Sequence, residues 1–286
     1  MKRSPVSKAR GEEWFAGKVA LVTGGASGLG RGIALALARA GCDLVLVDIN
    51  EEGMRETASL IEGVGRSCLI KKADVSSRTQ MERLAEEVIA ECGRVDVLVN
   101  NAGVGVGGEL ANIPLDDIEW ITGINLMGGI YGTRLFLPGM IARGEGHVVN
   151  VGSLSSLVVL PFHIAYTTTK FGLAGFSEAL WAECRRHGIG VTLVCPGAVS
   201  TNIAAGTRAH PGCERQRELT ERFERMLAEK GMDPGEAGRK VVEAVAADRF
   251  LLILGREAYL LYYLRRLLPG LMRRAVASLT AHASSE

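Results

Sequence analysis

The sequence predicts an α/β fold: a doubly wound parallel sheet of about seven strands in a single domain. Short apolar runs alternate with amphipathic helical segments, which is typical of a parallel sheet with helices on both faces. A glycine-rich turn joins the first run to the first helix, and no linker interrupts the alternation. The length of 286 residues is compatible with one large α/β domain.

The elements follow in chain order. Strands are expected at residues 18–23, 43–48, 67–72, 95–100, 147–151, 190–195 and 249–254. Helices are expected at residues 30–40, 51–62, 78–92, 118–142, 163–187 and 233–247. We place the folded domain at residues 14–255, between a mobile basic arm (1–13) and an amphipathic C-terminal extension (256–286).

Composition excludes several classes of function. Lys and Arg number 33 against 32 Asp and Glu, so no overall field would attract nucleic acid. The six cysteines form no CxxC pair and the histidines no HExxH motif, which favours reduced thiols and no metal over a disulfide or zinc framework. No signal-peptide core and no run of ~18 apolar residues is found, so we expect a cytoplasmic protein.

Residues 23–30 (TGGASGLG) form the turn after the first strand. Gly24, Gly28 and Gly30 let the backbone turn tightly and approach a pyrophosphate, and the next helix directs its free N–H groups at that anion. The pattern predicts a Rossmann-type dinucleotide site that includes Ser27 and Leu29. A second glycine-rich stretch, residues 103–108, matches GxGxxG but leads to Pro114, so we interpret it as a flexible loop.

Two acidic residues end neighbouring strands. Asp48 ends the second strand, where a carboxylate can accept both ribose hydroxyls of an adenosine and would repel a 2′-phosphate. Neither Ile49 nor Asn50 is basic, so NAD is favoured over NADP. Asp74 ends the third strand and either faces the adenine or caps the next helix.

Tyr166 and Lys170 lie four residues apart on an expected helix and therefore share a face. A nearby ammonium favours the phenolate of a tyrosine and lowers its pKa, which makes the pair a candidate proton shuttle. Taken alone, the pair could equally be a surface contact.

In order along the chain, the sequence contains TGxxxGxG at 23–30, NNAG at 100–103, Asn125, Ser153, YxxxK at 166–170 and PG at 196–197. This set resembles the short, single-domain branch of the short-chain dehydrogenase/reductase family over residues 15–254. The resemblance implies that Tyr166 is the general acid/base and that Ser153 holds the substrate oxygen. It also implies that Lys170 lowers the Tyr166 pKa and binds the nicotinamide ribose, while Asn125 holds a water.

NAD is the expected cofactor because of Asp48. Beyond the glycine turn and Asp48, the expected cofactor-binding residues are Asp74, Val75, Asn101, Ala102, Gly103, Tyr166, Lys170, Pro196, Gly197, Val199 and Thr201. Asn101 and Ala102 would lie on the adenosine side, and Thr201 on the carboxamide side. A homodimer or homotetramer through helices 118–142 and 163–187 is implied as well.

The stretch 154–162 (LSSLVVLPF) is apolar and lies between Ser153 and Tyr166. It predicts a hydrophobic alcohol or ketone of steroid, retinoid, fatty or aromatic type as substrate; packing against another subunit is the other interpretation. A non-catalytic dinucleotide-binding regulatory module is the alternative function, and a dehydratase or epimerase a third. The complete Ser–Tyr–Lys–Asn set favours the enzyme.

The two segments after the PG motif differ in character. Residues 202–230 are polar and are expected to be a mobile cover over the substrate. Residues 259–279 place leucines on one side of a helical wheel and arginines on the other, with a break at Pro269-Gly270. This extension either packs on the substrate cleft or a partner subunit, or it lies on an anionic membrane surface.

Overall fold

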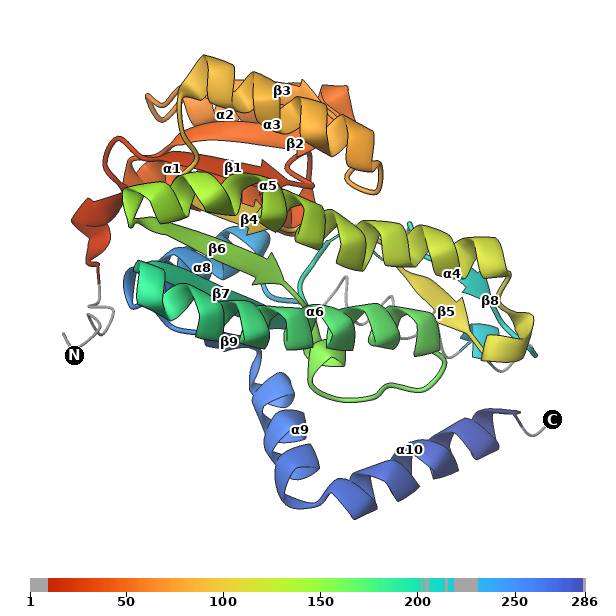
Figure 1. The fold of residues 1–286 in the computed structure, drawn as a ribbon. Coiled ribbons are helices and arrows are strands. Elements are labelled where there is room, and N and C mark those ends of the chain that lie inside the picture. Colours follow the sequence, from red (N-terminus) through yellow and green to blue (C-terminus); the bar gives the residue numbers. More distant parts are fainter. Residues whose placement is uncertain (1–9, 202, 204–205, 214–215, 219–230, 285–286) are drawn as a thin grey trace.

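The computed structural model describes residues 10–201, 203, 206–213, 216–218 and 231–284 (Figure 1). A seven-stranded sheet in the order β3-β2-β1-β4-β6-β7-β9 forms the centre, and all its neighbouring strands are parallel. Its strands are β1 (Val19–Thr23), β2 (Asp43–Asp48), β3 (Cys68–Lys72), β4 (Val97–Asn100), β6 (Gly146–Val151), β7 (Ile189–Pro196) and β9 (Leu251–Leu254). The predicted fold class is therefore confirmed.

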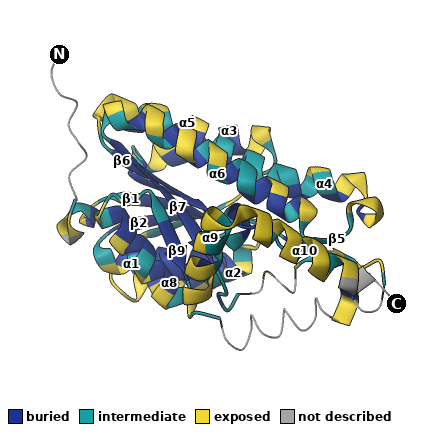
Figure 2. Cartoon of the chain, turned by 90° about the horizontal axis from the view of Figure 1, so that it is seen from below, coloured by how far each residue is buried: buried dark blue, intermediate teal, exposed yellow. Residues whose placement is uncertain are grey.

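Six helices cover the sheet, three on each face (Figure 2). One face carries α1 (Gly28–Ala40), α2 (Glu51–Glu62) and α8 (Pro234–Ala246). The other carries α3 (Arg78–Cys92), α5 (Gly128–Arg143) and α6 (Ile164–Cys184). The strand order runs outward from β1 in both directions, so the crevice between β1 and β4 is a topological switch point where such sheets bind ligands.

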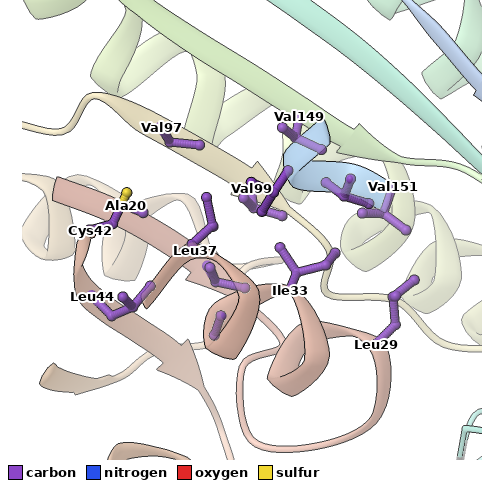
Figure 3. Packing of buried hydrophobic residues seen from close by; sticks show 14 of the residues in the cluster. Ala20, Leu29, Ile33, Leu37, Cys42, Leu44, Val97, Val99, Val149 and Val151 are labelled. Carbon is purple, nitrogen blue, oxygen red and sulfur yellow. The ribbon is translucent and has the colours of Figure 1, made fainter. Parts of the chain in front are cut away.

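The close packing of α1 on the sheet explains how the glycine turn is held. Leu29, Ile33 and Leu37 recur every four residues on one face of the helix and lie over buried side chains of β1, β4 and β6 (Figure 3). Burying a side chain of this size contributes roughly 1.5–3 kcal/mol. The helix ends at Gly41, whose φ of 110° is the left-handed conformation of a helix cap.

The second glycine-rich stretch is not the flexible loop that we expected. Val106–Gly108 is a short strand, β5, which pairs in parallel with β8 (Arg208–His210) from the segment expected to cover the substrate. A side chain at Gly105 would collide with Thr207, so the glycine permits this close approach. Most of the rest of segment 202–230 lies outside the described residues.

The expected helix 118–142 is longer and irregular. It consists of α4 (Leu115–Thr122), a π-helical turn (Gly123–Met127) and α5 in one run. A π turn inserts an extra residue into a helix and often occurs at functional sites. This one contains Asn125.

The two ends of the chain behave differently. Of the expected arm, residues 10–13 contact the domain: the Arg10 guanidinium donates to Gly146 O and Gly188 O, at 2.9 and 3.1 Å. At the other end, α9 (Arg256–Leu267) and α10 (Pro269–Ser284) form the extension, and the break expected at Pro269-Gly270 is confirmed. Within the described part of the chain, no helix is long and apolar enough to span a membrane.

Candidate active site

The glycine turn folds against the end of β4. Gly24 has a φ of 67°, and a side chain there would lie 2.7 Å from Asn101 Nδ2. At Gly30 a side chain would lie 2.5 Å from the same nitrogen and would also collide with the Gly24 carbonyl. The sequence therefore needs glycine at both positions for the turn to close.

The N-terminus of α1 fits an anion. Ser27 is its N-cap residue, but its side chain makes no capping hydrogen bond. The N–H groups of Gly28, Leu29 and Gly30 belong to the first turn, which has no intrahelical acceptor for them. Bare backbone, free donors and the positive end of the helix dipole together suit the pyrophosphate of a dinucleotide.

Asn101 lies against the start of the glycine turn. Its amide donates to the carbonyl oxygens of Thr23 and Gly24, at 2.9 and 3.2 Å, and Thr23 Oγ1 accepts from the N–H groups of Asn101 and Ala102. Asn101 thus ties the start of the glycine turn to β4. Asn101 is the second asparagine of the NNAG motif. In this structure its side chain supports the backbone of the glycine turn.

Asp48 lies beside the glycine turn as predicted. Its carboxylate accepts from Ala26 N at 3.1 Å and from Asn50 N at 3.0 Å. Sequence reasoning missed Arg31 on the same side: its guanidinium donates to Ala26 O at 2.6 Å and pairs with Glu56 at 2.7 Å. Arg31 therefore pairs with Glu56, whereas no basic side chain of the described residues forms an ion pair with Asp48.

The other expected cofactor residues differ in their neighbours: some lie near the glycine turn, Lys170 or the end of β7, and others contact the start of α3 or α5. Thr201 lies within 3.3 Å of the space above Gly28, and Gly103 lies against Asn125 and the Lys170 amine. Pro196 ends β7 and Gly197 follows it, while Val199 is buried beside Met232. By contrast, the Asp74 carboxylate accepts from Ser76 N and Oγ, at 2.9 and 2.7 Å, and Val75 packs against the residues of α5.

The four expected catalytic residues come from three neighbouring elements. Ser153 follows β6, Tyr166 and Lys170 lie on α6, and Asn125 lies in the π turn. The Ser153 side chain favours the ionised form of Tyr166 and therefore lies beside its hydroxyl. The Lys170 amine lies 5.6 Å from the centre of the Tyr166 ring and donates to Val151 O at 3.0 Å. The structure therefore brings the predicted set together at the carboxyl ends of the strands.

Ser153 is held by its own loop. Its Oγ accepts from Ser155 N, and its N–H donates to Ser156 Oγ, both at 3.1 Å. These reciprocal bonds form a capping box at the one-turn helix Leu154–Ser156. Ser155 and Ser156 therefore orient Ser153.

Burial governs the titration of the pair on α6. It raises the pKa of Tyr166, and the neighbouring Ser153 side chain opposes that rise. It also lowers the pKa of Lys170 to about 8. The expected lowering of the Tyr166 pKa by Lys170 is not what the structure shows, because desolvation of the phenolate has the larger effect.

Asn125 links the π turn to the glycine-rich stretch. Its Oδ1 accepts from Val104 N at 2.8 Å, and its Nδ2 donates to Val104 O at 2.9 Å and to Thr169 Oγ1 at 3.3 Å. Both polar atoms of the side chain therefore have protein partners. Asn125 thus fixes the backbone next to Gly103, where an added side chain would lie 3.5 Å from the Lys170 amine.

A buried polar chain beneath the site was missed by sequence reasoning. Asn100 Nδ2 donates to Asn150 Oδ1 at 2.8 Å, and Asn150 Nδ2 donates to Ser177 Oγ at 2.9 Å. It connects β4, β6 and α6. Asn101 follows β4, Ser153 follows β6, and Tyr166 lies on α6. Asn100 and Asn150 both stand at strand positions where apolar residues are usual, which is the signal that could have revealed them.

The surroundings of the Tyr166 ring are apolar, and Asp117 holds a neighbouring strand beside them. The Tyr166 ring packs in a cluster with Val106, Ile113, Ile121 and Ala165. Nearby, Asp117 of α4 binds both Arg208 and His210 of β8, the latter at 2.7 Å, and the Arg208 guanidinium stacks 3.6 Å from the centre of the Trp120 ring. These contacts fix β8 over the apolar cluster.

The chain matches the model of a known family over residues 18–212, described as short chain dehydrogenase. It is 36% identical to SadH of Mycobacterium tuberculosis over 92% of this chain and 95% of that protein. It is 33% identical to epidermal retinol dehydrogenase 2 of Mus musculus over 89% of this chain and 79% of that protein.

Solved structures agree with the sequence matches. A short-chain dehydrogenase/reductase from Burkholderia phymatum in complex with NAD superposes with a TM-score of 0.83 at 30% identity, covering 90% of this chain and 95% of that one. An alcohol dehydrogenase from Thermococcus sibiricus complexed with 5-hydroxy-NADP gives 0.71 at 26% identity, covering 83% and 95%. The fold is thus one that binds a nicotinamide dinucleotide, and its neighbours hold either form.

Proposed function

The chain belongs to the short-chain dehydrogenase/reductase family, and we propose that it transfers a hydride between NAD(H) and a hydrophobic secondary alcohol or ketone. The observation that carries this proposal is the convergence of Ser153, Tyr166 and Lys170 beside the glycine turn. A proton-transfer group and a dinucleotide cradle in one crevice are what alcohol oxidation requires.

The nicotinamide, when bound, supplies the hydride acceptor for oxidation or the hydride donor for reduction. Tyr166 takes the proton of the substrate hydroxyl during oxidation and returns it to the carbonyl oxygen during reduction. Ser153, held by its capping box, binds the same substrate oxygen. Lys170 supplies positive charge beside the phenol, and Asn125 keeps the neighbouring backbone and a water for proton exchange in place.

Replacing Tyr166 with Phe tests this assignment. We expect kcat on a good substrate to fall by at least 10²-fold, the scale of general acid–base catalysis, while NADH binding measured by fluorescence stays unchanged. Tyr131→Phe, which removes a phenol hydroxyl from α5, is the matched control and should keep full turnover. Turnover that survives Tyr166→Phe would refute the role of the phenol. A wild-type protein that binds NADH but oxidises or reduces no member of a broad substrate panel would instead favour a non-catalytic dinucleotide-binding module.

The preference for NAD is proposed from Asp48. Its carboxylate lies against Ala26 N, at the turn where an adenosine ribose would bind, and a 2′-phosphate placed there would be repelled. We expect Asp48→Ser to reduce the ratio of kcat/KM for NAD over NADP at least tenfold. Asp43→Ser, at the opposite end of the same strand, is the control. A wild-type protein that prefers NADP contradicts the proposal.

The hydrophobic character of the substrate is proposed from the loop after β6 and from the cluster around Tyr166. Leu154, Leu157 and Val158 lie in this loop, and the Tyr166 ring packs on apolar neighbours. The names of two relatives point to hydrophobic alcohols: retinol, a primary alcohol, and the secondary 17-hydroxyl of estradiol. A panel of steroid, retinoid, fatty and aromatic secondary alcohols against sugar alcohols, read by NADH absorbance, tests the class; a better kcat/KM for sugars would contradict it.

We further propose a homodimer or homotetramer in the cytoplasm. The helices expected at the interface, α5 and α6, carry partly buried apolar residues such as Tyr131, Leu135 and Phe176. The six cysteines are free thiols, which suits a reducing compartment.

A further inference from the structure

The outer side of α9 is apolar and open. Leu260, Tyr263 and Leu267 follow one another at helical spacing and are 61%, 54% and 74% exposed. The opposite side of the helix is covered, since Ala258 is fully buried and Tyr262 packs on the cluster of β7 and β9. α9 therefore has exposed apolar side chains on the side that does not pack on its own domain.

The apolar surface continues onto α10. Leu271 and Leu279 are about 60% exposed, at 60% and 62%, and Leu268 at the break between the helices is exposed as well. Figure 1 shows α10 running from the end of α9, apart from the sheet and its covering helices, and its main neighbour is α9. We call the set Leu260, Tyr263, Leu267, Leu268, Leu271 and Leu279 the tail face.

The charge around the tail face has one sign. Residues 258–285 contain four arginines and no Asp or Glu. The Arg266 guanidinium donates to Tyr262 Oη and that of Arg273 to Pro269 O, so both of these partners are uncharged. A helix pair with open leucines, tyrosines and uncompensated arginines is complementary to a surface that is apolar inside and anionic outside.

The covered side of α9 connects the extension to the candidate active site. Arg265 donates to the carbonyl of Leu157, in the loop that follows Ser153, and its guanidinium lies 4.5 Å from the centre of the Phe171 ring. Leu157 and Tyr262 also belong to one apolar cluster. A surface bound by the tail face would thus lie one helix away from the loop of the catalytic serine.

We propose that the tail face binds the surface of an anionic lipid bilayer, with its leucines in the acyl region and Arg266, Arg273 and Arg274 at the lipid phosphates. We expected the extension either to pack on the substrate cleft or a partner subunit, or to lie on an anionic membrane surface. α9 packs on the loop that follows Ser153, and the exposed side of both helices suits a membrane surface. The proposal concerns lipid binding alone and does not depend on the substrate or cofactor proposed above.

Sedimentation of the 286-residue chain with vesicles tests the proposal. One set of vesicles is phosphatidylcholine alone, and the other is phosphatidylcholine with 30% phosphatidylglycerol. We expect binding to the anionic vesicles that weakens with salt, and far less binding to the neutral ones. Each arginine near an anionic surface contributes about 1 kcal/mol, so R266Q/R273Q/R274Q should reduce the partition coefficient roughly 100-fold. L260S/L267S/L271S should reduce it to the background.

Two variants with equal numbers of substitutions are the controls. R55Q/R83Q/R239Q removes three exposed arginines, and L60S/L110S/L115S three exposed leucines, from other helices and loops. Both should bind as the wild type does. Absence of binding to anionic vesicles, or binding that the tail-face variants leave unchanged, overturns the proposal. The proposal is also overturned if the wild-type protein is a dimer that does not bind vesicles and a tail-face variant is a monomer. The tail face would then be a subunit interface.

Discussion

A charged group at the centre of the site should make the stability of the protein depend on pH. Lys170 is 3% exposed, and burial lowers its pKa from 10.5 to about 8. Between these values the unfolded chain holds a proton on this amine that the folded protein does not. The free energy of unfolding must therefore rise with pH in this window, and the cost of burying the ammonium is fully present below pH 8.

The size of the effect follows from the two pKa values. From pH 7 to pH 10 the folded amine loses nearly all of its proton, while the unfolded amine keeps about three quarters of it, which amounts to about 2.5 kcal/mol. Lys170→Met removes this titration. The variant should gain stability relative to wild type at pH 7, and the gain should shrink by about 2.5 kcal/mol when both are measured at pH 10.

Urea unfolding followed by circular dichroism, at pH 7, 8, 9 and 10, measures the difference. Only the difference between the two proteins is used, because other lysines, tyrosines and cysteines titrate in the same range in both. Lys72→Met removes an exposed lysine from β3 and serves as the control, with a difference that stays flat. A flat difference for Lys170→Met as well would show that its amine is not desolvated, and the electrostatic description of the site would be wrong.

Two further substitutions test the cradle and the segment over the substrate side. Gly30→Ala places a methyl group 2.5 Å from Asn101 Nδ2 and against the Gly24 carbonyl, so we expect at least a tenfold weaker binding of NADH; Gly175→Ala, with open space around it, should bind NADH normally, and equal binding by both would refute the close packing of the turn. Asp117→Ala removes the shared partner of Arg208 and His210, so amide exchange in residues 206–213 should accelerate several-fold. The pKa of Asp117 is lowered by these partners, so the same loosening should appear in wild type as the pH falls below the ordinary value of this carboxyl; exchange that is independent of both changes would exclude this role.

The sheet could be predicted from the sequence because local signals dominate it. Each of its strands is a short apolar run, and the predicted strand ends agree with the structure to within two residues. The pairing of Tyr166 with Lys170 is likewise a matter of helical spacing. Such features depend on neighbours within a few positions, which the sequence displays directly.

Features that depend on distant contacts were not accessible in the same way. The strand β5 exists because β8, about 100 residues further on, pairs with it, and neither stretch has a strand pattern of its own. Whether the Tyr166 pKa is raised or lowered depends on how much water the folded site excludes. The four-residue spacing of Tyr166 and Lys170 does not reveal this. Asn101 shows the same point, since its partners Thr23 and Gly24 are far away in the chain.

The topology explains why the functional residues could still be recognised while their partners could not. In a parallel sheet every strand delivers its carboxyl end to the same edge, so Thr23, Asp48, Asn101 and Ser153 reach one crevice whatever the loops do. What each residue does there is decided across the sheet, by the hydrogen bonds that join β1 to β4 and β4 to β6. The buried chain from Asn100 through Asn150 to Ser177 makes the positions of Ser153 and α6 interdependent. A polar residue inside a buried strand is therefore as informative about the geometry of such a site as the residue that performs the chemistry.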